Sequence, residues 1–131
     1  MRKHPYLNHA TCVARLHEWY KRNGRLIVAY DFDNTVYDYH SKGHDYSEVI
    51  ELLRRAKKAG CYLIVFTGNE NKDFVIRYLV ENDIPYDLIN EHAPFAPSKA
   101  RKIYANILLD DAAGLESAFH QLEDFLNHEN L

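Results

Sequence analysis

The strongest constraint on the fold is a short apolar stretch, Leu-Ile-Val-Ala-Tyr at residues 26–30, that runs directly into Asp-Phe-Asp-Asn-Thr at residues 31–35. An apolar run of this length predicts a buried strand, which here would carry two carboxylates at its tip. Asp31 and Asp33 have the same parity, so on a continuing strand they would point to one face. Like charges held together in this way need a balancing cation, and hard oxygen ligands favour Mg²⁺. We therefore expect metal-dependent chemistry at this segment.

Further along the chain, apolar runs that resemble strands alternate with segments of helical periodicity. We expect strands over residues 26–31, 61–66, 86–90 and 103–109, and helices over residues 9–22, 72–82 and 113–127, with another helix that is capped at Asp45 or Ser47 and runs to residue 59. Residues 34–44 and 91–98 are expected to be loops. This alternation predicts an α/β fold with a doubly wound, mainly parallel sheet and helices on both faces.

Size and charge limit the classes of protein that fit. The chain has 131 residues and is 47% apolar, which suits one domain with a substantial core. We assign residues 1–24 to a helix that leads into a core over residues 25–131. The net charge of −3 means that the chain has no overall positive charge with which to bind the phosphates of nucleic acid. No signal-peptide pattern and no apolar run of about 20 residues is present, so we expect a cytoplasmic protein without a membrane partner.

Polar side chains close three of the predicted strands. Asp31 and Asp33 follow the first strand, Thr67 follows the second, and the pair Asp110-Asp111 follows the last. Right-handed crossovers in a parallel sheet bring such strand ends to one edge, which is where ligands bind in doubly wound folds. We therefore expect these side chains to share one crevice.

These segments together resemble the haloacid dehalogenase superfamily of phosphotransferases. The first family motif, Asp-x-Asp-x-Thr, stands at residues 31–35, the second is Thr67 at the end of an apolar strand, and the fourth is Asp110-Asp111. The third motif is a lysine ahead of the last strand, so all four occur in family order. The resemblance implies a Rossmann-like sheet of order 3-2-1-4 and a small phosphatase without a large cap domain.

The resemblance also implies a role for each motif residue. Asp31 would be the nucleophile that becomes an aspartyl phosphate, and Asp33 would be the general acid and base. Thr35 favours a phosphatase over a mutase or an ATPase. The Mg²⁺ ligands would be Asp31, Asp33 through its backbone carbonyl, Asp110 and Asp111. The residues expected at the phosphoryl group are Thr67, Thr35, Gly68, Asn69 and a lysine.

Two lysines are candidates for the third motif. Lys102 precedes the paired acids by the short interval that relatives often show, and Lys99 lies three residues earlier. We prefer Lys102 as the catalytic lysine and keep Lys99 as a second phosphate-binding candidate.

The segment after the first motif leaves further alternatives. His40 and His44 are four residues apart, but the surrounding loop has no helical periodicity, so histidines that face solvent or substrate fit better than a zinc pair. Without a cap, the crevice would admit large substrates, or a neighbouring subunit of a homo-oligomer would cover it. The sequence does not choose between these arrangements.

Other functions compete with a metabolite phosphatase whose substrate is unknown. Capless relatives include polynucleotide phosphatases, although the acidic balance of this chain disfavours a strong grip on nucleic acid. A receiver domain would also use paired acids, an acceptor Asp, a Thr and a Lys, but its paired acids precede the acceptor, whereas here they come last. A catalytically silent binding module is the remaining alternative, and it would be expected to have lost a motif residue.

Overall fold

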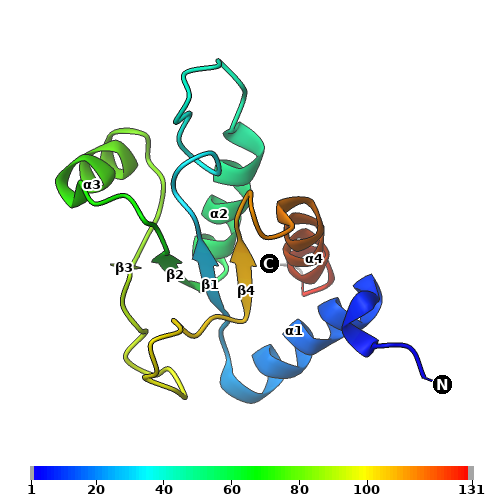
Figure 1. Ribbon diagram of the computed structural model, residues 1–131. Helices are drawn as coiled ribbons and strands as arrows, with labels where there is room; N and C mark the ends of the chain where they lie inside the picture. The colour runs from blue at the N-terminus through cyan, green and yellow to red at the C-terminus, as the bar shows by residue number, and fades with distance from the viewer. Residues whose placement is uncertain (1, 130–131) are drawn as a thin grey trace.

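The apolar runs form a parallel sheet in the computed structural model, which describes residues 2–129 (Figure 1). A short 3-10 helix, η1 (Pro5–Leu7), precedes the other elements. The remaining elements, in chain order, are α1 (His9–Asn23), β1 (Ile27–Tyr30), α2 (Ser47–Lys58), β2 (Tyr62–Val65), α3 (Lys72–Glu81), β3 (Leu88–Ile89), β4 (Ile107–Leu109) and α4 (Leu115–His128).

The strand order is β3-β2-β1-β4, and all three pairings are parallel. β1 is central, with Tyr30 in register with Val65 of β2 on one side and with Leu109 of β4 on the other. This arrangement confirms the predicted α/β fold, its strand order and the absence of a large cap from residues 2–129. The carboxyl ends of β1, β2 and β4 therefore lie side by side at one edge of the sheet.

The main core lies on one face of the sheet. Alternate strand residues such as Val28, Tyr30 and Leu109 are fully or almost fully buried there, because successive side chains of a strand point to opposite faces. Apolar stripes of the helices pack against them, including Leu16 of α1 and Phe125 of α4. Figure 1 shows α2 behind β1 and β4, with α4 beside β4. The helices surround the sheet as predicted, and buried side chains of α1, α2, α3 and α4 all belong to this main core.

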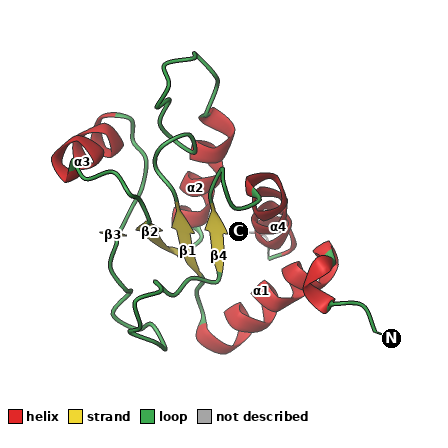
Figure 2. Ribbon diagram, viewed as in Figure 1, coloured by secondary structure: helices red, strands yellow, loops and turns green. Residues whose placement is uncertain are grey.

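The opposite face has a smaller core under an irregular cover. Ile27 and Ile64 are buried there against Ala93 and partly buried side chains of residues 96–105. Figure 2 shows this segment as a long loop between β3 and β4. His92 links the start of this segment to Ala100, since one ring nitrogen of His92 lies 2.5 Å from the backbone oxygen of Ala100. Phe66, directly after β2, stays 42% exposed and lines a hollow together with Ser98, Ala100 and Lys102.

The last strand begins later than the predicted residue 103. β4 pairs with β1 from Ile107 onward, opposite Val28, and β1 itself begins only at Ile27. The buried side chain of Asn106 then accepts a hydrogen bond from the N–H of Ile27 at 2.7 Å, which closes the ladder. Residues 103–105 have no strand beside them and adopt an irregular path instead.

No helix within residues 2–129 combines the length and the apolar character that crossing a membrane requires.

The Asn106 side chain generates a stability prediction. In Asn106→Ala the buried N–H of Ile27 loses its acceptor, so we expect the free energy of unfolding to fall by about 1–3 kcal/mol. Urea unfolding followed by circular dichroism measures this change. Asn127→Ala is the matched control, since Asn127 is exposed on α4 and its replacement should change stability by less than about 0.5 kcal/mol. Equal effects of the two substitutions would contradict this role of Asn106.

Candidate functional site

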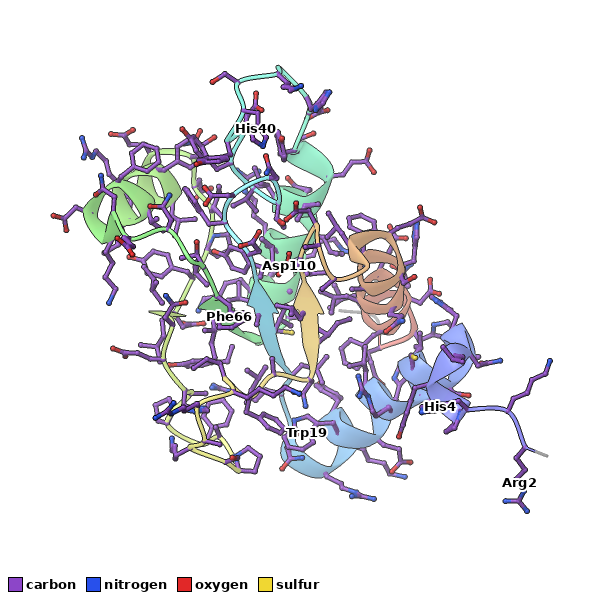
Figure 3. The ribbon with its side chains drawn as sticks, in the orientation of Figure 1. Arg2, His4, Trp19, His40, Phe66 and Asp110 are labelled. Carbon is purple, nitrogen blue, oxygen red and sulfur yellow. The ribbon has the colours of Figure 1, made fainter. Side chains whose placement is uncertain are left out.

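Three carboxylates gather where β1 and β4 end. The N–H of Asp31 donates to the backbone oxygen of Leu109 at 2.9 Å, so Asp31 and the neighbouring Asp110 leave adjacent strands side by side. Carboxylate oxygens of Asp31, Asp110 and Asp111 all lie within 4.8 Å of one another. Figure 3 shows Asp110 at the carboxyl end of the sheet. The structure thus brings together three of the four predicted metal ligands through their side chains.

Thr35 lies beneath this acid cluster of Asp31, Asp110 and Asp111. It is fully buried, and its hydroxyl oxygen accepts a hydrogen bond from the N–H of Asp111 at 3.2 Å. The same hydroxyl is 3.4 Å from carboxylate oxygens of Asp31 and Asp111, and it can donate to one of them at a time. A hydroxyl buried under the acids is placed to orient them, and the role of Thr35 in binding phosphate stays a prediction.

A tight turn follows β1 and contains Asp33, which is not part of the cluster of mutually close carboxylates. The backbone oxygen of Phe32 accepts hydrogen bonds from the N–H groups of residues 35–37, and Asn34 adopts a left-handed φ of 63°. The Phe32 ring is buried and stacks on Tyr37 with 5.1 Å between ring centroids, which holds the turn in place. Because the chain reverses here, the parity argument for a continuing strand fails. The Asp33 carboxylate instead lies 3.4 Å from the side-chain nitrogen of Asn69.

The loop after β2 lies beside this turn. The hydroxyl of Thr67 accepts a hydrogen bond from the N–H of Asn69 at 3.1 Å, which curls the chain around Gly68. Within residues 2–129, the N–H of Gly68 makes no hydrogen bond to the protein. Thr67, Gly68 and Asn69 thus form a polar loop within reach of Asp33, next to the carboxyl end of β1.

Asn90 is a positioning residue that the sequence analysis did not identify. Its side chain accepts from the N–H of Thr67 at 2.9 Å and donates to the backbone oxygen of Thr67 at 2.8 Å. It follows β3 directly and adopts a left-handed φ of 54°. The available signal was a polar residue directly after the third strand, since Asp31 and Asp110 directly follow β1 and β4 in the same way.

The two candidate lysines lie apart from the acids. The Lys99 ammonium group donates to the backbone oxygens of Ala93 at 2.9 Å and Pro94 at 3.4 Å. Lys102 is exposed and lines a hollow of about 650 Å³ that also reaches Ala113 and Gly114, just after the paired acids. Across residues 2–129 no lysine, arginine or histidine forms an ion pair with the acid cluster.

The electrostatics of the cluster are dominated by the burial of Asp31, and no basic ion-pair partner among the described residues offsets it. Burial raises the pKa of Asp31 to about 7, helped by a hydrogen bond with the Asp111 carboxyl group and by the negative charge of Asp110. The N–H of Phe32 acts in the opposite direction but does not offset these effects. A donor set of carboxylate oxygens alone fits a hard divalent cation such as Mg²⁺, which would supply the missing positive charge.

Comparison with known proteins supports the fold of this chain but does not indicate its chemistry. A solved structure of a conserved protein from Bacteroides thetaiotaomicron, described only by its locus, is similar with a TM-score of 0.60. The two chains are 19% identical, and the match covers 81% of this chain and 91% of that one. No family model matches the chain, and no curated protein matches it significantly. The likeness at this identity supports the fold alone.

The raised pKa of Asp31 generates a prediction about stability without metal. The unfolded chain loses this proton near the ordinary value of 3.8 and the folded chain near 7, so ionised Asp31 weakens the fold as pH rises between these values. We expect Asp31→Asn to be more stable than the parent at pH 8 by about 1–2 kcal/mol, allowing for solvent screening of a half-buried group.

Urea unfolding in the presence of a chelator measures this difference across the pH range. The advantage of Asp31→Asn should shrink steadily as the pH falls from 7 towards 4. Asp73→Asn is the control, because Asp73 is exposed at the start of α3 and should show no comparable pH trend. If Asp31→Asn were less stable than the parent at pH 8, the electrostatic account would be contradicted.

Proposed function

We propose that this chain is a haloacid dehalogenase-like, Mg²⁺-dependent phosphatase that hydrolyses phosphomonoesters through an aspartyl phosphate. The placement of Asp31 beside Asp110 at the ends of adjacent parallel strands supports this function most directly. Thr67 at the end of the next strand supplies a phosphate-binding loop on the other side of β1. The same residue types occur in the same chain order as in the family that the sequence resembles.

The acid cluster would hold the cation. Its ligands would be carboxylates of Asp31, Asp110 and Asp111, together with the backbone carbonyl of Asp33. A bound Mg²⁺ neutralises charge and polarises the phosphoryl oxygens, so that an anionic ester can approach several carboxylates. Thr35 supports the site by holding the N–H of Asp111 and orienting the carboxylates above it.

Asp31 and Asp33 divide the chemistry between them. An oxygen of Asp31 attacks phosphorus, the bond from phosphorus to the ester oxygen breaks, and Asp33 gives its proton to that leaving oxygen. A water molecule then attacks phosphorus while Asp33 takes a proton from it, and the bond between phosphorus and the Asp31 oxygen breaks to release inorganic phosphate. The turn at residues 32–37 suits this division, because it places the Asp33 carboxylate beside Asn69 rather than within the group formed by Asp31, Asp110 and Asp111.

Thr67, Gly68 and Asn69 would bind the phosphoryl oxygens. The hydroxyl of Thr67 and the backbone N–H of Gly68 are donors suited to an oxyanion, and the Asn69 side chain holds Asp33 beside them. Lys102 is the better candidate for the remaining positive charge. Its hollow reaches the residues that follow Asp111, whereas the ammonium group of Lys99 is occupied by two backbone oxygens.

Turnover of an aryl phosphate tests this function. With p-nitrophenyl phosphate and millimolar Mg²⁺ we expect measurable hydrolysis that a chelator abolishes and that Asp31→Asn reduces to background, because the nucleophile is lost. Asp73→Asn is the matched control and should keep the parent rate. Undiminished activity of pure Asp31→Asn would refute the assignment, and a long-lived phosphoprotein without turnover would instead indicate a phosphate-accepting signalling domain.

The two lysines can be separated in the same assay. Lys102→Met should lower kcat/KM by about 10²-fold or more, because a charge that stabilises the transition state is lost, whereas Lys99→Met should have a much smaller effect. Thermal unfolding of both variants controls for structural damage, since Lys99 also holds the backbone of residues 93–94. Normal turnover by Lys102→Met would show that Lys102 has no such role.

A further inference from the structure

A preorganised loop overhangs the carboxyl edge of the sheet. Residues 38–46 connect the turn after β1 to α2 and form the uppermost segment in Figure 1. Asp38 organises this loop, since its carboxylate accepts hydrogen bonds from the N–H of Lys42 at 3.1 Å and from that of Gly43 at 2.7 Å. The hydroxyl of Tyr46 adds a third at 3.4 Å. These bonds lower the pKa of Asp38, the Gly43 N–H making the largest contribution, and they fix the path of the loop.

The loop and the acid cluster share a hollow of about 320 Å³. Its walls include Asp111 of the cluster, Asn34 of the preceding turn, and the basic side chains of His40, Lys42 and His44. Figure 3 shows His40 in the loop above the strand end that carries Asp110. The hollow therefore adjoins the point where the proposed reaction takes place.

The basic side chains around this hollow are free to bind an anion. Among residues 2–129, His40, Lys42 and His44 make no ion pair and no side-chain hydrogen bond. Asp38 also borders the hollow, but two backbone N–H groups and a tyrosine hydroxyl already satisfy its carboxylate. Within the described part of the chain, the loop consequently presents unpaired basic groups next to a cluster of unpaired acids.

We infer that the loop of residues 38–46 binds a second anionic group of the substrate, so that the substrate is a small phosphomonoester that also carries a phosphate or a carboxylate. This inference rests on the proposed phosphatase function. The cation at the acid cluster would face the phosphoryl group that is removed, and Lys42 with the two histidines would face the second anion. Binding energy from such a remote group can be used at the reacting centre, which matters in a site without a large cap.

Selectivity between substrates tests the inference. The probes are p-nitrophenyl phosphate, which has a single anionic group, fructose 1,6-bisphosphate, which has a second phosphate, and 3-phosphoglycerate, which has a carboxylate. We expect the parent protein to have a higher kcat/KM for at least one doubly anionic probe than for the aryl phosphate. We expect Lys42→Gln to lower the ratio of those two kcat/KM values about tenfold or more, since a charged contact to the second anion is lost.

The variants are chosen to preserve the fold. Lys42→Gln keeps the backbone N–H that donates to Asp38, and His40→Asn with His44→Asn removes the two imidazole side chains without altering that bond. Lys42→Arg should restore most of the selectivity. Lys58→Gln is the matched control, because Lys58 is exposed on α2 and does not line the hollow.

The outcomes separate the inference from the function on which it rests. No turnover of any probe by the parent would refute the phosphatase function, whereas turnover with an equal loss for both kinds of substrate in Lys42→Gln would refute only the second-anion site. A preference for 5′-phosphorylated oligonucleotides would also overturn it. Calorimetric titration of fructose 1,6-bisphosphate and 3-phosphoglycerate into Asp31→Asn with Mg²⁺ provides a readout without turnover. Adding Lys42→Gln should weaken that binding about tenfold, and an unchanged affinity would refute the inference.

Discussion

The parallel pairing of β1 with β4 is the contact on which the candidate site depends. It sets Tyr30 against Leu109, so the residue that follows each strand, Asp31 or Asp110, emerges beside the other. The bond from the Asp31 N–H to the Leu109 oxygen extends this register by one step. Residues that are far apart in the chain therefore share one electrostatic environment, and a shift of one residue in the ladder would send their side chains to opposite faces.

Charge is distributed unevenly along the carboxyl edge of the sheet. The acid cluster has no basic ion-pair partner within residues 2–129, and the three basic side chains of the loop above it form no ion pair there, although His44 interacts electrostatically with the Asp38 carboxylate. A structure selected only for stability would pair such groups, because unpaired like charges raise the free energy of the folded state. The separation of the two signs across one hollow favours a ligand that supplies both partners, namely a cation at the acids and an anion under the loop.

Much of the fold follows from local pattern. The apolar runs that precede Asp31, Thr67 and Asp110 predict three strands of the sheet, because their short length and their β-branched and aromatic residues favour a buried strand over a helix. The strand order was predicted from family resemblance and is confirmed. The late start of β4 could not be predicted, since it depends on where β1 begins and on the buried side chain of Asn106.

The amino-acid sequence by itself determined which residue types stand at the strand ends, since the order of apolar, acidic and hydroxyl residues along the chain is a local property. Only the tertiary structure decided where the side chains of those residues lie and which groups they contact. Thr35 is buried under the acids, Asp33 lies beside Asn69, and Asn90 holds the loop of Thr67. Each of these placements depends on backbone turns with left-handed residues and on hydrogen bonds between distant segments, which periodicity does not encode. The sequence therefore determines which chemical groups lie at the carboxyl edge of the sheet, and the fold determines the positions of those groups.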